Sequence, residues 1–449
     1  MKILIVGGDA AGMSAASQIR RRQPSWTVEV FEAGRRTSYA LCGTPYYLGG
    51  LVKQIDQLVS ITPEQFERDR GIKVHTGHLV TAVSPARKSI TVKDLASGQS
   101  REEGYDRLVL ATGAEALVPV GLEPGPEGLF YLRTLDDAVN IRQAMASARS
   151  AVVVGAGYIG LEVAENLVEA GLEVTLLGRK PAPIFEPEMQ NMTALALARP
   201  GLNFRADTDA TGLSRAPGGG LTVTTSQGPA VTADMVVVGA GVRPRSELAA
   251  EAGLTLGARQ SIGVDRHQRT SNPFIYAAGD CAESYHLVTK TGTWVALALG
   301  ANRQGRVAGI NISGEVEKFP GILGTSIMKV FDLALARTGV GLEEAQKAGL
   351  KEAAKTVVKQ ASKPGYYPGS SQVTVIIIYD RLTGRLLGGQ LAGTVDGVGQ
   401  RVNTLAAAIA AGMTVREAAG LDTAYAPPFA PVHDPVVIAC EVAAKNLRS

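Results

Sequence analysis

The chain has 449 residues, enough for about three domains, and hydrophobic residues make up 45% of it against 19% for charged residues. This is a globular composition, and the 52 glycines predict many close backbone approaches. The 45 basic and 42 acidic residues are scattered along the chain and leave a net charge of +3. Nucleic-acid binding is therefore not expected.

The cysteines and the apolar runs indicate the compartment. Cys42, Cys281 and Cys440 are too far apart for a disulfide framework or for a metal site with CxxC spacing. No apolar run approaches the roughly 18 residues of a membrane span. The N-terminal segment breaks into glycines too early for a signal peptide. We expect a protein without metal, soluble and cytoplasmic.

The N-terminal elements predict a nucleotide-binding unit. A buried strand over 2–6 leads into a glycine turn, helical character follows over 13–22, and a strand over 28–31 ends at Glu32. Strand, glycine turn, helix, strand and acid is the order of a dinucleotide-binding βαβ unit. A later strand over 107–110 closes this unit.

The glycine turn itself is incomplete. Gly7, Gly8 and Gly12 are present, but Asp9 stands where the middle glycine is expected. Such glycines let the backbone approach a pyrophosphate at the N-terminus of a helix. Glu32 supports the prediction, because a carboxylate at that place can accept a hydrogen bond from a ribose 2′-OH.

A second unit of the same kind follows. A strand over 151–154, a complete turn with Gly155, Gly157 and Gly160, a helix over 161–170 and a strand over 173–177 predict a second nucleotide. No acid ends that strand; Arg179 and Lys180 follow it instead. Their cations favour the 2′-phosphate of NADPH, although both residues are also compatible with a solvated turn.

The rest of the chain divides at about residue 324. A β-meander before it ends in a strand over 235–238, and a strand near 275 ends at Gly279 and Asp280. Beyond 324, strands over 326–330 and 373–379 and an Ala-rich helix over about 398–411 lack a nucleotide fingerprint. They predict a separate α+β domain.

Cys42 is the candidate redox group. It precedes a segment expected to turn into a helix through Pro45 and Tyr46, and a helix N-terminus lowers the pKa of a thiol. Taken alone, such a cysteine is also compatible with a small buried side chain. No second cysteine lies four or five residues away, so the chemistry left is a mixed disulfide or a sulfenic acid.

The ordered motifs resemble a known family. The chain is similar to the pyridine nucleotide-disulfide oxidoreductases, within them to the single-cysteine branch of coenzyme A disulfide reductases, NADH oxidases and NADH peroxidases. The motifs are GGDAAGMSAASQIRR, SYALCGTPYYLGG, LVLATGA, VVVGAGYIGLEVAENL, VVVGAGVRPRSEL, IYAAGDCAE, ANRQGR, YYPG and YAPPFAPVHDP. They cover essentially the whole length.

The resemblance implies an α/β fold with two Rossmann-like dinucleotide-binding domains, for FAD and NAD(P), and a C-terminal α+β dimerisation domain. The implied boundaries are an FAD-binding domain in two parts, an NAD(P)-binding domain between them, and the dimerisation domain: 1–112 and 246–323, 113–245, and 324–449. A homodimer follows from the same resemblance.

The resemblance also assigns site residues. Those for FAD are Gly7, Gly8, Gly12, Glu32, Thr112, Gly113 and Asp280. Those for NAD(P) are Gly155, Gly157, Tyr158, Gly160, Glu162, Arg179 and Lys180, with Tyr158 gating the nicotinamide side of the flavin. Those for coenzyme A are Gln18, Arg21, Arg22 and Ser38. The catalytic set is Cys42 with Tyr367 and Tyr425 of the partner chain, Tyr366 being an alternative to Tyr367.

The implied activity is the reduction of coenzyme A disulfide, or a related small disulfide, by NADPH or NADH through FAD and Cys42. An NAD(P)H oxidase or a polysulfide reductase using the same cysteine is the alternative. Peroxidases and many oxidases of this branch have a histidine at the position of Ala10. Its absence here weakens the prediction of a peroxidase activity. A flavin-dependent redox sensor with a protein partner is a further alternative from another class.

Overall fold

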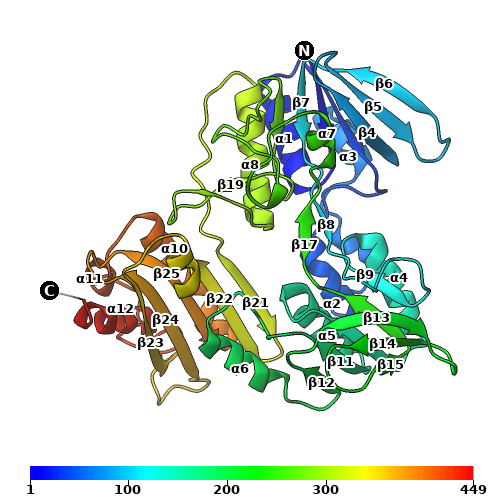
Figure 1. Cartoon of the computed structure of the whole chain (residues 1–449). Helices are drawn as coiled ribbons and strands as arrows, with labels where there is room; N and C mark the ends of the chain where they lie inside the picture. The colour runs from blue at the N-terminus through cyan, green and yellow to red at the C-terminus, as the bar shows by residue number, and fades with distance from the viewer. Residues whose placement is uncertain (448–449) are drawn as a thin grey trace.

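The computed structural model describes residues 1–447 as three five-stranded sheets with their helices and several smaller sheets (Figure 1). The first sheet has five parallel strands in the order β18-β7-β1-β2-β3. Its strands are β1 (Lys2–Val6), β2 (Thr27–Glu32), β3 (Lys73–Thr76), β7 (Arg107–Leu110) and β18 (Ile275–Ala277). Because β18 comes from far along the chain, this sheet joins two distant parts of the sequence.

Two helices pack side by side against this sheet, α1 (Ala10–Arg22) and α8 (Ala298–Ile312). They approach closely because α8 has glycines on the facing side. A Cβ on Gly305 would lie 2.1 Å from the Ala11 carbonyl oxygen, and one on Gly309 would lie 2.6 Å from that of Ala15. The close approach brings the polar residues of both helices together at their exposed edge.

The second sheet has the order β12-β11-β10-β16-β9, all parallel. Its strands are β9 (Leu129–Tyr131), β10 (Ser150–Val154), β11 (Glu173–Leu177), β12 (Leu202–Arg205) and β16 (Met235–Val238). Its helices are α4 (Leu135–Met145), α5 (Tyr158–Glu169) and α6 (Pro187–Leu197). The meander is β13 (Ala210–Arg215), β14 (Leu221–Thr225) and β15 (Val231–Ala233). The antiparallel pair β8 (Ala114–Ala116) and β17 (Val242–Pro244) lies between this part and the first sheet (Figure 1).

The third sheet is antiparallel, in the order β21-β22-β25-β24-β23. Its strands are β21 (Ser326–Val330), β22 (Leu333–Gly339), β23 (Ala353–Ala361), β24 (Gln372–Asp380) and β25 (Leu386–Gly393). Its helices are α9 (Leu342–Lys347), α10 (Val395–Ala410), α11 (Val415–Ala419) and α12 (Pro435–Lys445). One large buried cluster, which includes Leu167, Leu335 and Ile376, continues from this sheet into the second part.

Shorter elements complete the first part. A three-stranded antiparallel sheet contains β4 (His78–Ser84), β5 (Ser89–Asp94) and β6 (Ser100–Gly104). The remaining elements are α2 (Thr44–Leu48), α3 (Pro63–Arg70), α7 (Glu247–Glu251), β19 (Ser284–Tyr285), β20 (Gly292–Thr293), and the 3-10 turns η1 (Leu41–Gly43), η2 (Ile55–Leu58) and η3 (Ala258–Gln260). Of these, η1 contains Cys42.

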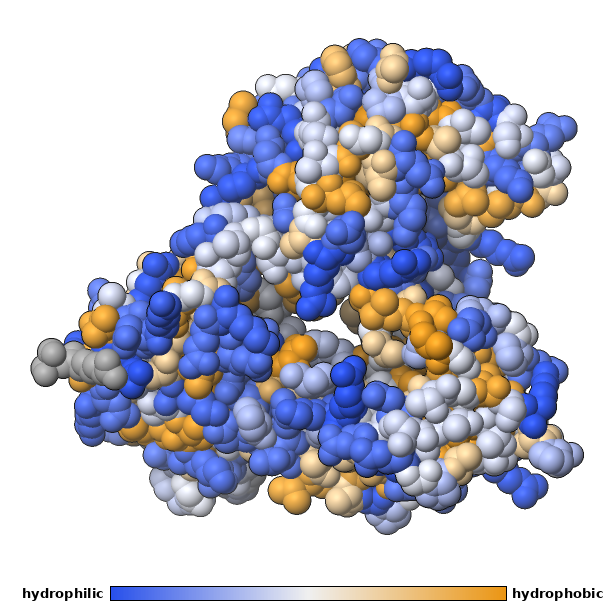
Figure 2. Space-filling view, viewed as in Figure 1, coloured by the Kyte–Doolittle hydropathy of each residue, from blue (hydrophilic) through white to orange (hydrophobic). Residues whose placement is uncertain are grey.

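The predicted fold class is confirmed, with differences in one strand and at three helix starts. The strand over 235–238, expected to end the meander, is β16 of the second parallel sheet, and the meander ends at β15. The helices expected from 13, 161 and 398 begin at Ala10, Tyr158 and Val395. The first two start earlier because residues of the glycine turns already form the first helical turn. The space-filling view shows hydrophilic side chains over much of one face and a hollow between the three parts (Figure 2). Among the described helices, none is long and apolar enough to cross a membrane.

Candidate active site

The first glycine turn packs so closely on neighbouring backbone that a side chain would not fit at two of its glycines. Gly7 has φ of 108°, and a Cβ on it would lie 2.1 Å from the Ala111 carbonyl oxygen. A Cβ on Gly12 would lie 1.9 Å from the Gly7 carbonyl oxygen. The Glu32 carboxylate accepts hydrogen bonds from the amides of Gly8 and Gly34, each at 2.7 Å. The acid is therefore fixed at the turn, where a ribose would bind.

Polar groups around this turn fit the FAD that the glycine pattern implies. Within the described chain, the buried Thr37 Oγ1 and Arg133 Nε have no hydrogen-bond partner. Arg133 lies 3.7 Å from the Asp280 carboxylate, whose pKa is raised by burial against the opposing effect of this cation. Such unpaired buried groups are costly, so they favour a polar ligand at this place.

Thr112 and Gly113 lie where β7 ends, beside this turn. The Thr112 hydroxyl donates to the Arg245 carbonyl at 2.5 Å, and Gly113 has φ of 73°. The Ala278 amide, one residue beyond β18, donates to the Leu110 carbonyl at 3.0 Å. The carboxyl ends of β1, β7 and β18 therefore meet, and parallel α/β sheets bind ligands at that edge.

The second glycine turn repeats the first. Gly155 has φ of 105°, and a Cβ on it would lie 2.5 Å from the Gly239 carbonyl oxygen. A Cβ on Gly160 would lie 1.7 Å from the Gly155 carbonyl oxygen. No atom lies within 4 Å of a Cβ added to Gly157. This turn leaves the space in front of α5 open.

Tyr158 and Glu162 lie on the first turns of α5. The Tyr158 hydroxyl is 2.5 Å from Ser326 Oγ on β21, and its ring packs edge-on against Phe185 with centroids 6.3 Å apart. Burial, and to a lesser degree the nearby Glu165 carboxylate, raise the pKa of Glu162 to about 7. This carboxyl can therefore hold a proton near neutral pH.

The two cations after β11 have acidic neighbours. Arg179 Nε lies 3.5 Å from Asp209 Oδ1, and the two side chains are 80% and 58% exposed. Lys347 and, more weakly, Lys180 lower the pKa of Glu343. Both cations are exposed to solvent, so the structure does not enclose them in a preformed phosphate-binding site.

Cys42 is exposed in η1, directly before α2. The prediction that its pKa is lowered is wrong for this chain. Although the residue reaches solvent, the protein atoms packed around its thiol raise the pKa by desolvation. The charges of Glu162 and Asp280 raise it further, and Arg133 opposes them only in part. The five-residue helix α2 does not offset two carboxylates.

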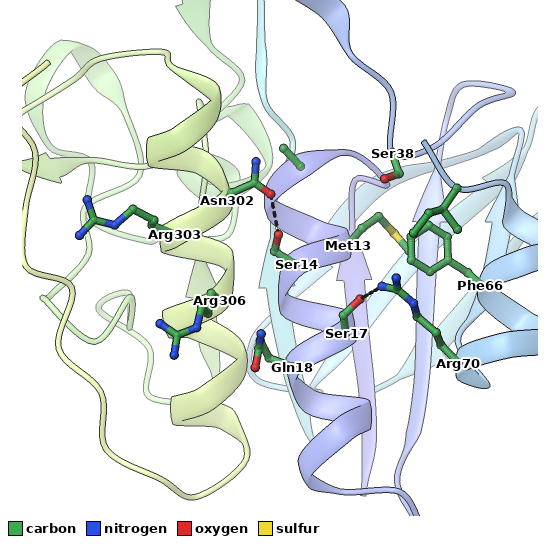
Figure 3. Close-up of a pocket in the computed structure, with 12 residues that line it drawn as sticks. Met13, Ser14, Ser17, Gln18, Ser38, Phe66, Arg70, Asn302, Arg303 and Arg306 are labelled. Carbon is green, nitrogen blue, oxygen red and sulfur yellow. Dashed lines mark hydrogen bonds between the residues drawn. The ribbon is translucent and has the colours of Figure 1, made fainter. Parts of the chain in front are cut away.

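A cavity of about 310 Å³ lies between α1, α3 and α8 (Figure 3). Arg70 reaches from α3 to the Ser17 hydroxyl at 2.8 Å, and Ser14 donates to Asn302 on α8 at 2.8 Å. The lining residues are Ala10, Met13, Ser14, Ser17, Gln18, Ser38, Ile61, Phe66, Arg70, Asn302, Arg303 and Arg306. A second cavity of about 400 Å³ shares two of them and is lined by Ser17, Arg20, Arg21, Pro24, Asp69 and Arg70.

Three of the four residues predicted for coenzyme A line these cavities. Gln18 and Ser38 line the first, and Arg21 lines the second. Arg22 lines neither, because its guanidinium pairs with Glu315 at 2.9 Å.

Sequence reasoning missed the contributions of α3 and α8. Arg70 lies on α3, and the ANRQGR motif places Asn302, Arg303 and Arg306 on α8. Arg306 also pairs with Glu317 at 2.9 Å. The three-residue spacing of Arg303 and Arg306 was the available signal, since it places both on one helix face.

The candidate tyrosines lie at the other end of the chain. Tyr366 and Tyr425 are 75% and 47% exposed, and a hydrogen bond to Tyr425 raises the pKa of Tyr366. The sequence favoured Tyr367 with Tyr425, whereas the structure joins Tyr366 to Tyr425. Both phenols face away from the interior of this chain.

The other two cysteines are buried. Cys281 Sγ donates weakly to the carbonyls of Leu110 and Ala278, each at 3.4 Å, and Cys440 lies in the core around α12. Both side chains are 0% exposed. In the part of the chain that is described, no group of three His, Cys, Asp or Glu side chains is arranged to hold a metal ion.

Comparison with known proteins places this chain among redox enzymes. It is 36% identical over 446 residues to a Pyrococcus furiosus protein named NAD(P)H sulfur oxidoreductase (CoA-dependent), covering 98% of each chain. It is 32% identical over 433 residues to a Staphylococcus haemolyticus protein named coenzyme A disulfide reductase, covering 95% of this chain and 96% of that one. The solved structure of reduced Bacillus anthracis CoADR-RHD matches with a TM-score of 0.95 and 34% identity, over 99% of this chain and 80% of that chain.

Two family descriptions match nearly the whole chain. The pyridine nucleotide-disulphide oxidoreductase family matches residues 1–305, and its dimerisation domain matches residues 325–435. The matched relatives are FAD-dependent NAD(P)H oxidoreductases. The chain therefore belongs to the pyridine nucleotide-disulphide oxidoreductase family.

Proposed function

We propose that this enzyme reduces coenzyme A disulfide with NADPH, using Cys42 as the redox thiol. The observation that supports this most is a pair of cavities that share Ser17 and Arg70, the first of which is also lined by Ser38 from the segment that leads to Cys42. Ser38 lines the first cavity, Arg70 lines both, and Arg21 lines the second. Guanidinium groups bind phosphate through charge-assisted hydrogen bonds, and coenzyme A is rich in phosphate.

The two glycine turns would hold the two nucleotides. FAD would bind at Gly7, Gly8, Gly12, Glu32, Thr112, Gly113 and Asp280. NADPH would bind at Gly155, Gly157, Tyr158, Gly160, Glu162, Arg179 and Lys180. When bound, FAD passes two electrons from the nicotinamide to sulfur.

The thiol chemistry belongs to this chain. The Cys42 thiolate attacks one sulfur of the disulfide, forms a mixed disulfide and displaces the other coenzyme A as a thiolate, which takes up a proton. Two electrons from NADPH then cleave the mixed disulfide and release the second thiol. In sum, NADPH, one proton and one disulfide give NADP⁺ and two thiols. Because the pKa of Glu162 is about 7, its carboxyl oxygen takes up a proton as the pH falls through neutrality, which removes the negative charge that raises the pKa of Cys42.

The test is the Cys42→Ser variant. It should keep its yellow FAD and lose turnover with coenzyme A disulfide, because a hydroxyl cannot form the mixed disulfide. Cys440→Ala is the matched control, since that thiol is buried in α12 and should leave turnover unchanged. Full disulfide turnover by Cys42→Ser contradicts the proposal.

Polysulfide is the second candidate oxidant. A Pyrococcus horikoshii relative, 36% identical over 449 residues, is named NAD(P)H coenzyme A polysulfide/persulfide reductase. The exposed Cys42 thiol is open to such a chain of sulfur atoms. Turnover with coenzyme A disulfide, polysulfide and oxygen under each nicotinamide separates the candidates; oxygen as the fastest acceptor would favour an oxidase.

We also propose a homodimer that works in the cytoplasm. The match to a dimerisation domain over residues 325–435 supports the dimer, in which Tyr425 and Tyr367 or Tyr366 reach the partner's cysteine. The three cysteines are all free thiols, which suits a reducing compartment.

A further inference from the structure

The two glycine turns of this chain can be compared directly. After the second strand of each unit, the chain returns to the turn that precedes the helix. The Ser38 amide donates to the Gly8 carbonyl at 3.0 Å, and the Ala182 amide donates to the Ala156 carbonyl at 2.8 Å. Ser38 and Ala182 both have φ of 50°, in the left-handed region that residues other than glycine seldom adopt. The two loops therefore meet their turns in the same way.

The two turns differ at one matched pair of positions. In the first turn, Asp9 occupies the middle position and its Oδ1 accepts a hydrogen bond from the Tyr39 amide at 3.1 Å. In the second turn, Gly157 occupies the middle position and offers no side-chain acceptor. Pro183, the residue after Ala182, has no amide proton. Donor and acceptor are thus both present in the first turn and both missing from the second.

Nucleotide binding does not explain the carboxylate of Asp9. Its backbone is extended, with φ of −109° and ψ of −155°, close to the −86° and −168° of Gly157. Its side chain makes no capping hydrogen bond further into α1, although the amide of Ala10, the first residue of α1, lowers its pKa together with the Tyr39 amide. Burial raises the pKa of Asp9 to about 6, and its negative charge opposes a pyrophosphate at the same helix end. The Tyr39 amide is therefore the partner that distinguishes this turn from the second one.

The partner of Asp9 belongs to the segment that leads to Cys42. One edge of this segment is held by the backbone near η2, where the Ala40 amide donates to the Leu58 carbonyl at 2.8 Å. The other edge is joined to the glycine turn by the Ser38–Gly8 bond and by the Tyr39–Asp9 bond. The Tyr39–Asp9 bond depends on the side chain of Asp9, and it holds a residue that lies three positions before Cys42.

We infer that Asp9 is a positioning residue for Cys42. By accepting a hydrogen bond from the Tyr39 amide, it fixes the peptide that lies two residues before η1. It thereby fixes the place of the thiol relative to the FAD turn and the cavity lined by Ser38. The second unit carries no thiol after its loop, and there glycine and proline replace the pair. The effect on turnover rests on the proposed function, whereas the Tyr39–Asp9 contact does not.

Two substitutions at position 9 separate the hydrogen bond from the charge. Asp9→Gly copies the second turn, so it is compatible with folding and removes the acceptor. Asp9→Asn keeps an acceptor oxygen and removes the charge. We expect Asp9→Gly to keep FAD and NADPH-dependent ferricyanide reduction, while kcat for coenzyme A disulfide falls about ten- to hundred-fold. Asp9→Asn should stay within about two-fold of the wild type.

Two further measurements need no turnover. Hydrogen exchange at the Tyr39 amide should be about ten-fold faster in Asp9→Gly than in the wild type, and close to the wild type in Asp9→Asn. The rate of Cys42 alkylation by iodoacetamide should change in Asp9→Gly both with and without bound FAD. The thiolate-to-flavin charge-transfer absorbance of the reduced enzyme should weaken in Asp9→Gly and persist in Asp9→Asn.

Three outcomes would overturn the inference. They are wild-type turnover and exchange in Asp9→Gly, an Asp9→Asn variant that behaves like Asp9→Gly, and loss of FAD from Asp9→Gly. Wild-type behaviour of Asp9→Gly would mean that the Tyr39–Asp9 bond does not position Cys42. An Asp9→Asn variant like Asp9→Gly would mean that the negative charge matters rather than the hydrogen bond, and loss of FAD would mean that Asp9 serves cofactor binding. If Cys42→Ser itself keeps disulfide turnover, the proposed function fails, and exchange and alkylation still decide the role of Asp9.

Discussion

The Arg179 guanidinium has two candidate partners: the Asp209 carboxylate, 3.5 Å away, and the 2′-phosphate of NADPH. An exposed ion pair contributes at most about 1 kcal/mol, whereas a charge-assisted bond to phosphate contributes about 1.5 to 3 kcal/mol. The phosphate should therefore displace Asp209. Asp209 then acts as a competitor that moderates the preference for NADPH.

The ratio of kcat/KM for NADPH to that for NADH tests this competition. Arg179→Ala should lower the ratio by about one to two decades, because the phosphate loses its cation. Asp209→Asn should raise the ratio by up to about five-fold, because the cation loses its competitor. An unchanged ratio in Arg179→Ala would make Arg179 a surface residue, and Lys180→Ala would then be the next variant to measure.

The charge of Glu162 should control the ionisation of Cys42. The Glu162 carboxyl, with a pKa of about 7, is neutral below that pH and negative above it, and its negative charge raises the pKa of the thiol. Glu162→Gln removes the charge, so the pH midpoint of Cys42 alkylation should move down. Glu169→Gln, an exposed residue at the end of α5, is the control and should leave the midpoint in place. An unchanged or raised midpoint in Glu162→Gln would contradict the control by charge, because the Gln amide has no charge and still offers N–H donors.

At the scale of elements, α5 is tied to the C-terminal sheet through its first residue. Tyr158 is held by Ser326 of β21, 168 positions further along the chain. If Tyr158 moves aside to admit nicotinamide, this hydrogen bond opposes the movement. The C-terminal sheet would then affect coenzyme binding through Ser326.

Ser326→Ala should lower KM for NADPH about two- to ten-fold with little change in kcat, because one neutral hydrogen bond no longer holds Tyr158 in place. Ser326→Thr keeps a hydroxyl and should restore the wild-type KM. Steady-state kinetics at saturating coenzyme A disulfide separate KM from kcat. A fall in kcat with unchanged KM would mean that the Tyr158–Ser326 hydrogen bond contributes to the reaction itself and does not hold Tyr158 against nicotinamide binding.

Elements with a strong local pattern could be predicted from the sequence, and contacts between distant elements could not. The strands over 107–110, 173–177 and 326–330 have the predicted bounds, because each is a short apolar or alternating run between turn residues. The cavity between α1 and α8 needed the packing of two helices that are nearly 300 residues apart, which no local pattern shows. The raised pKa of Cys42 likewise arises from burial of the thiol and from the charges of Glu162 and Asp280, which come near the thiol only in the folded chain.

At the scale of the whole molecule, the candidate catalytic groups are separated. Figure 1 shows α11 and α12 on the opposite side of the molecule from α2. Tyr425 lies between α11 and α12, and Cys42 lies directly before α2. One chain alone therefore does not bring the phenol to the thiol, whereas a two-fold dimer can place each tyrosine beside the partner's cysteine.

A mixed dimer tests this arrangement. One chain carries Cys42→Ser, and the other carries phenylalanine in place of Tyr366, Tyr367 and Tyr425. If the sites are shared, one site of the mixed dimer lacks both the thiol and the phenols, and the other is intact. About half of the wild-type turnover should then return, because the two sites of a symmetric dimer are equivalent. If each site lies within one chain, turnover of the isolated mixed dimer equals the average of the two parent dimers.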